Sequence, residues 1–177
     1  MSAPLAPRDV DPVVALDPMR FRDAMARLGS AVNIVTTDGP HGWAGFAASA
    51  VCSVTDMPPT LLVCVQRTSS AYAALHGNRV LCVNTLSSSH EALSQLFRGK
   101  TPMSQRFAAA EWTALATGAP VLRDARVAFD CRIDRVAEVG THDVLFCRVA
   151  AIASNVGTDE GLYYVERRYR RLAEARI

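Results

Sequence analysis

The succession of strand-like segments constrains the fold of this chain more than any other feature. Only short helical segments separate these strands, whereas a parallel crossover needs a connection of about a dozen residues or more. The sequence therefore predicts a mainly β fold, an antiparallel split β-barrel with peripheral helices. Segments with the apolar and β-branched composition of strands occur at residues 31–37, 46–54, 60–65 and 79–86.

The clearest strand lies in the second half of the chain, in RVAFDCRIDRV. Val127, Phe129, Cys131 and Ile133 occupy alternate positions there, which is the period of a half-buried strand. Residues 143–153 are predicted to be its partner, joined to it through the turn-like AEVGTHD.

Capping residues predict several short helices. Asp17 is placed to cap the first, with Pro18 at its first position and Gly29 at its end. The other predictions are a helix in SSAYAALHGN ended by Gly77, a helix opened by a Ser88–Glu91 capping box, and a helix over residues 103–109.

Length and composition indicate one globular domain, because the chain has 177 residues of which 50% are hydrophobic and 20% charged. Residues 1–12 are rich in Pro and Ala without periodicity, and we expect a flexible arm followed by a domain over residues 13–177. No signal peptide and no membrane-length apolar run is visible. Five cysteines without a CxxC pair favour free thiols and a cytoplasmic location.

Several functional classes lack their motifs. RGKT, residues 98–101, resembles the end of a phosphate-binding P-loop, but Ser94 stands where that loop needs glycine. There is no GxGxxG or GxSxG, and no histidine or cysteine pair has metal-ligand spacing. A net charge of +2 disfavours nucleic-acid binding, and a cluster of arginines at residues 167–171 is interpreted as a solvated or salt-bridged surface.

The stretch GFAASAVCSV, residues 45–54, places very small side chains before an apolar strand. Small side chains expose backbone. Two interpretations remain open from composition alone: two elements pack closely here, or a flat ligand lies against the main chain.

Three segments in this order resemble the short-chain flavin reductases, which are small NAD(P)H-dependent partners of two-component monooxygenases. They are GFAASAVCSVTDMPPTLLVCV, RVLCVNTLSSSHEALSQLF and VGTHDVLFCRV. AVNIVTTDGP and GKTPMSQRFAAA look closest to the branch of that family that serves uracil ring opening. The resemblance implies an FMN-binding split barrel, a homodimer, and hydride transfer from NADH to FMN, with FAD and NADPH as alternatives. Reduced FMN would then pass to a separate monooxygenase by a transient link, and a flavin carrier or sensor without reductase turnover is the alternative function.

The resemblance also implies site residues. His142 is the catalytic candidate, on the nicotinamide side of the pocket. The cofactor-binding candidates are Thr36, Ala47, Ala48, Ser49, Ser53, Val54, Asn84, Thr85, His90 and Tyr169, with Arg67, Ser69 and Ser70 as a phosphate site at the start of a short helix. Purely structural roles stay open for some of them: a strand end for Asn84 and Thr85, a helix cap for Ser69 or Ser70, packing for Tyr169, and a surface position for His142.

Overall fold

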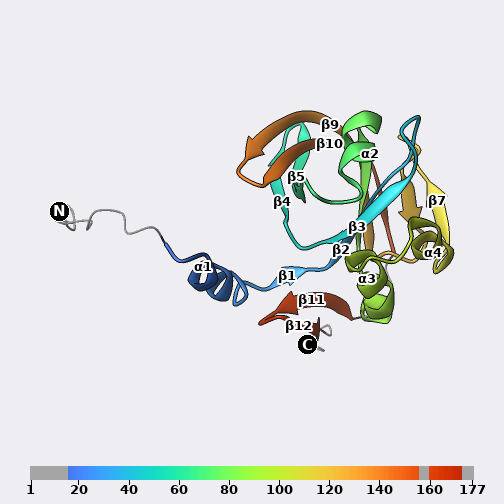
Figure 1. Cartoon of the computed structure of the whole chain (residues 1–177). Helices are drawn as coiled ribbons and strands as arrows, with labels where there is room; N and C mark the ends of the chain where they lie inside the picture. The colour runs from blue at the N-terminus through green and yellow to red at the C-terminus, as the bar shows by residue number, and fades with distance from the viewer. Residues whose placement is uncertain (1–15, 156–159, 173–177) are drawn as a thin grey trace, which may run out of the picture.

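The computed structural model describes residues 16–155 and 160–172, and the strand pairs within these ranges are all antiparallel (Figure 1). The predicted flexible arm, residues 1–12, lies outside the described residues. The helices are α1 (Pro18–Met25), α2 (Tyr72–Asn78), the short 3₁₀ helix η1 (Ser88–His90), α3 (Glu91–Arg98) and α4 (Met103–Ala108). The strands are β1 (Ser30–Ala31), β2 (Asn33–Thr37), β3 (Ala44–Ala48), β4 (Val51–Asp56), β5 (Pro59–Gln66), β6 (Val80–Thr85), β7 (Trp112–Ala114), β8 (Pro120–Leu122), β9 (Val127–Val139), β10 (His142–Ser154), β11 (Gly161–Val165) and β12 (Arg168–Leu172).

The main sheet has seven strands in the order β3-β2-β6-β9-β10-β5-β4. Its two edge strands, β3 and β4, follow one another in the chain and are joined through Ser49 and Ala50. The small-residue segment therefore crosses from one edge of the curled sheet to the other, at the opening of an incomplete barrel. Two small sheets accompany it, β1-β11-β12 and β7-β8.

The strand predictions are largely confirmed. β9 pairs with β10 through the predicted turn, and β4 turns into β5 at Met57 and Pro58. Residues 46–54, expected as one segment, instead divide between β3 and β4 because the chain changes edge there.

The predicted end of α2 and the predicted start of the next helical segment are wrong. Gly77 does not end α2, which continues to Asn78, and Arg79 closes the helix with a left-handed backbone at φ 60°. The capping box lies at Ser87 and His90, and it opens η1 before α3 begins.

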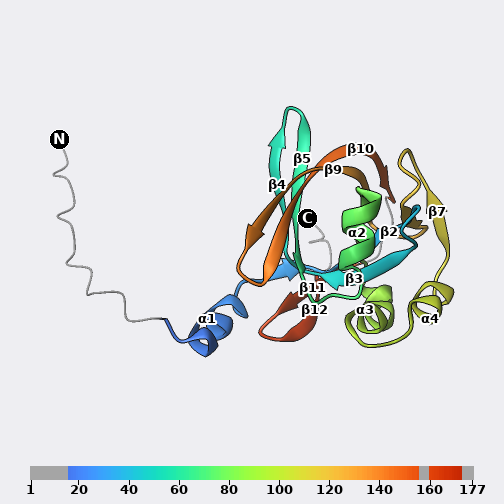
Figure 2. The same ribbon diagram turned by 45° about the horizontal axis from the view of Figure 1, so that its top comes forward.

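Helix α1 begins where predicted, but it ends at Met25 with Ala26 as its C-cap rather than at Gly29, and it stands away from the sheet. Asp17 caps it by accepting a hydrogen bond from the backbone N–H of Met19 at 2.9 Å. None of its residues is buried, and both views show it beside the main body rather than on it (Figures 1 and 2).

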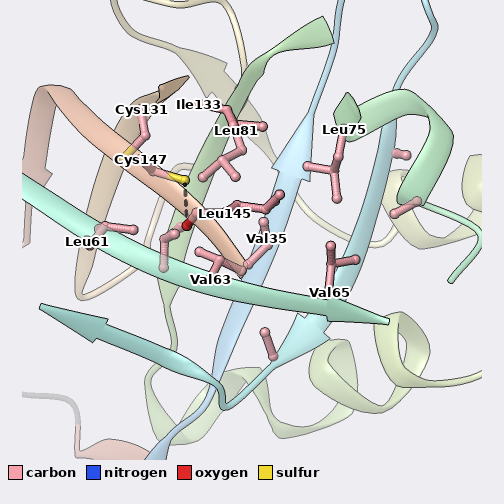
Figure 3. Close-up of a cluster of buried hydrophobic side chains, with 14 of the residues drawn as sticks. Val35, Leu61, Val63, Val65, Leu75, Leu81, Cys131, Ile133, Leu145 and Cys147 are labelled. Atoms are coloured by element: carbon pink, nitrogen blue, oxygen red, sulfur yellow. Dashed lines mark hydrogen bonds between the residues drawn. The ribbon is translucent and has the colours of Figure 1, made fainter. Parts of the chain in front are cut away.

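The principal core fills the space between the curled main sheet and α2. Val35, Val63, Val65, Leu81 and Leu145 are fully buried there and point toward one another (Figure 3). Their burial follows from the apolar strands that the sequence shows, and it removes apolar surface from water on one face of β5 and of β10. This core fixes the strands whose ends form the cleft described next.

A second core lies under α3 and α4 and is aromatic. Phe107 stacks on Trp43 with ring centroids 4.6 Å apart, and Phe97 meets Phe107 edge to face at 5.4 Å. Trp112 completes the cluster and donates its indole N–H to the carbonyl of Phe107. The aromatic cluster holds the α3–α4 segment against the loop that leads into β3.

Candidate functional site

An open cleft of about 1090 Å³ lies beside β3. Its floor is β3 and the residues that follow it, and two walls face each other across that floor. Figures 1 and 2 show α2 on one side of β3, with α3 and α4 on the other. We call residues 66–74 the α2 wall and residues 97–106 the basic wall.

The floor shows that both interpretations of the small-residue stretch hold, at different residues. A side chain at Gly45 would lie 2.8 Å from the ring of Phe97, so glycine here permits close packing of α3 on β3. Ala47, Ala48 and Ser49 instead line the cleft. Because β3 is an edge strand of the main sheet, part of its backbone is free of strand partners and available to a ligand.

The α2 wall is held in place by a buried carboxylate, Asp143, which is 1% exposed. Asp143 accepts hydrogen bonds from Arg67 Nε at 2.7 Å and from the hydroxyl of Tyr72 at 2.8 Å. Nε2 of His76 lies 3.1 Å from the same carboxylate, and Glu138 pairs with Arg67 at 2.9 Å. These contacts tie the start of α2 and the loop before it to β10.

The hydrogen bond from Arg67 holds the pKa of Asp143 below its ordinary value, against the opposing effect of desolvation. Asp143 in turn raises the pKa of the Tyr72 hydroxyl, chiefly by accepting its hydrogen bond. Asp143 is therefore ionised and Tyr72 protonated at neutral pH, and the Asp143 carboxylate is paired with the Arg67 guanidinium.

The basic wall is held by a buried cation, Arg106, which is 4% exposed. Its guanidinium donates to the carbonyls of Gly45 at 3.0 Å, Gly99 at 2.8 Å and Thr101 at 2.7 Å, with a longer contact to Phe97 at 3.4 Å. Among the described residues, the hydrogen bonds of this guanidinium all go to backbone carbonyls and none to a carboxylate. Burial lowers the pKa of Arg106, but an arginine remains protonated at neutral pH.

The formal charges on the cleft surface are all positive. The described residues that line the cleft include Arg98, Lys100 and Arg106, and none of them is Asp or Glu. A concave site that combines apolar residues with cations suits a flat, anionic ligand such as a nucleotide.

His142 lines the cleft at the start of β10, and its Nδ1 lies 2.9 Å from the hydroxyl of Thr141. His41 and Cys64 also line it. Burial raises the pKa of the Cys64 thiol, so Cys64 is protonated at neutral pH and is a poor nucleophile.

A smaller hollow of about 210 Å³ adjoins the floor and is also lined by Ala47, Ala48 and Ser49. Tyr169 lines it and shares a hydrogen bond of 3.0 Å with Ser94. Arg98 lines both hollows and donates to the hydroxyl of Tyr164 at 3.2 Å.

The structure brings only part of the predicted site together. Ala47, Ala48, Ser49, Ser69, Ser70 and His142 line the cleft, and Tyr169 lines the adjoining hollow. Ser69 accepts a hydrogen bond from the backbone N–H of Ala71, but the predicted cap by Ser69 or Ser70 is wrong, because the N-cap residue of α2 is Ala71 and no side chain caps the helix. Arg67, expected as the cation of a phosphate site, is turned to Asp143 and Glu138 instead.

The remaining predicted residues lie outside the cleft. Asn84 is fully buried and joins three strands: it donates to Ile34 O at 3.1 Å and to Thr36 at 3.2 Å, and accepts from Leu122 N at 2.8 Å. Thr85 donates to the side chain of Asn33 in the same sheet. These groups join strands of the protein interior and line neither the cleft nor the adjoining hollow, a role that differs from both the ligand contact and the strand end considered from the sequence.

Ser53 and Val54 are both exposed on β4, an edge strand of the main sheet that is exposed from Cys52 to Asp56, and neither lines the cleft. His90 is buried in the capping box with Ser87, and its Nε2 lies 3.1 Å from Asp124.

Sequence reasoning missed the basic wall. Arg98 and Lys100 belong to the RGKT segment, which was set aside because it is not a P-loop. Arg106 carries no recognisable motif, and its burial and backbone contacts follow from tertiary packing alone.

Within residues 16–155 and 160–172, no group of His, Cys, Asp and Glu side chains has an arrangement that could hold a metal ion. In the same part of the chain, none of the helices has both the length and the apolar character needed to cross a bilayer.

Comparison with known proteins agrees with this architecture. The family model described as flavin reductase like domain matches residues 25–173. The chain is 60% identical to the FMN reductase (NADH) RutF of Pantoea ananatis over 94% of this chain and 85% of that protein. It is 63% identical to the FMN reductase (NADH) RutF of Ancylobacter novellus over 90% of this chain and 87% of that protein.

Solved structures show the same fold. A protein of Haemophilus somnus 129PT assigned as a flavin reductase matches 89% of this chain and all of its own, at 47% identity and a TM-score of 0.86. The NADH:FAD oxidoreductase SgcE6 of Streptomyces globisporus matches 95% of this chain and all of its own, with a TM-score of 0.84 at 24% identity. The predicted split-barrel fold is thereby confirmed, and the chain belongs to the flavin reductase like domain family.

Proposed function

We propose that this protein is an NADH-dependent FMN reductase. The observation that carries the proposal is the cleft itself, in which the free edge of β3 forms the floor and the formal charges on the lining are positive. The names of relatives at 60–64% identity, FMN reductase (NADH) RutF, support the choice of FMN and NADH.

The cleft fits these two ligands in size and chemistry. Its volume of about 1090 Å³ is at the upper end of the roughly 300–1,000 Å³ usual for small-ligand sites. It therefore has room for a flavin nucleotide together with the nicotinamide end of a second nucleotide. Both ligands are anionic, and the absence of acidic residues from the described lining avoids repulsion.

The residues of the floor would hold the flavin by its edge. An isoalloxazine ring is flat and carries hydrogen-bonding groups around its rim. Ala47, Ala48 and Ser49 leave the backbone open to those groups, because no bulky side chain intervenes. When bound, FMN supplies the chemistry, since its N5 takes up the hydride that NADH gives.

The protein's own contribution is binding and orientation. The two walls would hold both nucleotides over the floor and exclude competing reactions. His142 lines the cleft at the start of β10, where it can contact the nicotinamide of NADH. Hydride transfer needs no nucleophile from the protein, which agrees with the protonated thiol of Cys64.

We further propose that the reduced FMN serves a separate flavin-dependent monooxygenase of pyrimidine degradation. The support is the name RutF of the relatives, together with the resemblance of the AVNIVTTDGP and GKTPMSQRFAAA segments. A homodimer, a transient link to the oxygenase and a cytoplasmic location belong to the same proposal.

The test is NADH oxidation by the purified protein, followed at the absorbance band of reduced nicotinamide with and without FMN. We expect consumption of NADH that depends on FMN, and slower consumption with NADPH. FMN binding without any NADH oxidation would overturn the reductase and favour a flavin carrier or sensor. Supplying the reduced flavin to a uracil-opening oxygenase in the same reaction tests the finer proposal.

A further inference from the structure

The RGKT segment, residues 98–101, is not a P-loop, yet it forms part of the basic wall of the cleft. We propose that Lys100, held in this segment by the buried Arg106, binds a phosphate group of a nucleotide in the cleft. The inference rests on the proposed function for the identity of the nucleotide, and it adds the residue that recognises the anionic end.

Lys100 is distinctive in composition and position. It is the only lysine of the sequence, whose 19 basic residues are otherwise arginine. It is exposed and lines the cleft, and no hydrogen bond or ion pair of its side chain is found among the described residues. A compact ammonium with three donors binds a phosphate as a point charge.

Arg106 orients the backbone of the loop so that the loop can bind an anion. Its guanidinium donates hydrogen bonds to the carbonyls of Gly99 and Thr101, on either side of Lys100, and makes a longer contact with the carbonyl of Phe97. These oxygens would repel a phosphate if they faced the cleft, and Arg106 turns them inward instead. The same buried cation adds positive charge behind the loop, because its hydrogen bonds go to carbonyls and leave that charge uncompensated.

The opposite wall lacks such a cation. Arg67, the residue expected to bind phosphate there, is engaged by Asp143 and Glu138. Arg98 is directed partly to the hydroxyl of Tyr164. Lys100 is therefore the cation of the lining that is most free to contact a ligand.

The phosphate can belong to either of the two nucleotides, the 5′-phosphate of FMN or the pyrophosphate of NADH. Riboflavin, which is FMN without the phosphate, separates recognition of the phosphate from simple covering of the lysine by the flavin ring.

The experiment uses the wild-type chain and a lysine-reactive acylating reagent, with modification of Lys100 measured by mass spectrometry. The α-amino group of the chain serves as the internal reference. We expect saturating FMN to slow acylation of Lys100 about tenfold or more, with riboflavin at equal occupancy of the flavin site giving little protection. Protection by NADH or NAD⁺ but not by FMN would also support the proposal and assign the phosphate to the dinucleotide.

A variant gives a second, independent measurement. Lys100→Ala should weaken binding of the protecting nucleotide about tenfold, as expected for loss of a charge-assisted hydrogen bond, and leave riboflavin binding unchanged. Arg168→Ala removes an equal charge from the exposed β12, outside the cleft, and should change neither affinity. Equal acylation rates with and without every nucleotide, or equal protection by FMN and riboflavin, would overturn the proposal. Because these measurements involve no turnover, a protein that binds FMN but does not oxidise NADH would contradict the proposed function alone.

Discussion

The two walls of the cleft are each organised by one buried ionised side chain, but the two side chains carry opposite charges and have different partners. Asp143, behind the α2 wall, is met by Arg67, Tyr72 and His76, so its charge is compensated. Arg106, behind the basic wall, is met by backbone carbonyls only. The buried charge of one wall is met by an opposite charge, whereas the other wall presents positive charge to the cleft.

This difference separates two ways of building a ligand site. The α2 wall supplies hydroxyls and small side chains, at Thr68, Ser69, Ser70 and Ala73, without a free charge. The basic wall supplies cations on a loop whose backbone acceptors are turned away. An anionic nucleotide placed between them is held by shape and neutral donors on one side and by charge on the other.

The largest effect should follow from Arg106→Met, which removes the buried cation behind the basic wall. Several carbonyls would lose their donors at once, and each unsatisfied buried acceptor costs about 1–3 kcal/mol. We expect the free energy of unfolding in urea, followed by tryptophan fluorescence, to fall by about 3 kcal/mol or more. Arg106→Lys keeps the charge but not the forked geometry, and it should lie between wild type and Arg106→Met; an Arg106→Met protein as stable as wild type would contradict this description of the loop.

Asp143→Asn removes the buried carboxylate behind the α2 wall and should have the next largest effect. Asparagine keeps the shape but leaves Arg67 without its buried counter-charge, so the thermal midpoint should fall. Because the pKa of Asp143 is lowered in the folded protein, its stabilisation is present at neutral pH and is lost as pH falls below about 4, through the folded pKa.

The check on Asp143→Asn is the stability difference from wild type, measured by thermal unfolding across the acidic range. We expect a gap at neutral pH that closes as the medium becomes strongly acidic. A gap that widens on acidification would assign the stabilisation to another group.

His142→Ala sharpens the functional side of the comparison, since His142 lies in the cleft but belongs to neither wall. We expect kcat/KM for NADH to fall about tenfold, equivalent to about 1.4 kcal/mol, with a smaller change in FMN affinity. Steady-state kinetics and FMN fluorescence titration provide the two readouts. Unchanged kinetics would remove His142 from the site.

The smallest effect should come from Tyr169→Phe, in the hollow beside the floor. It removes the hydrogen bond to Ser94, with an expected loss of about 0.5–1.5 kcal/mol in the free energy of unfolding. A double-mutant cycle with Ser94→Ala isolates this contact, and additive effects of the two substitutions would show that the contact contributes nothing.

How far the sequence leads depends on whether a feature is local or tertiary. The strand that begins at Val127, the cap at Asp17 and the small side chains at Ala47 and Ala48 follow from neighbouring residues, and the structure has all three. The predicted alternation of β9 holds only at Cys131 and Ile133, because Ala128 and Asp130, rather than Val127 and Phe129, are the buried residues in the first part of the strand. Which polar residues line the cleft and which lie within the sheet does not follow from neighbouring residues. Asn84 was expected at a ligand or a strand end, and its place in the buried sheet depends on partners far along the chain.

The basic wall was not predicted from the sequence for the same reason, because it depends on tertiary packing. Arg106 and Lys100 are neither periodic nor part of a known phosphate motif, and the role of one depends on the position of the other. Both residues lie in the GKTPMSQRFAAA segment that resembles the family, but neither that resemblance nor the presence of a single lysine among arginines shows that Lys100 lines the cleft.

The most direct test of the central claim, that the cleft between the two walls is the flavin site, is a crystal structure of the complex with FMN. We predict the isoalloxazine ring along Ala47–Ser49, with its rim on the free edge of β3 and both walls in contact with the nucleotide. A ring bound elsewhere, on the exposed face of β4 at Ser53 and Val54 or beyond the tyrosines of β11 and β12, would contradict the account.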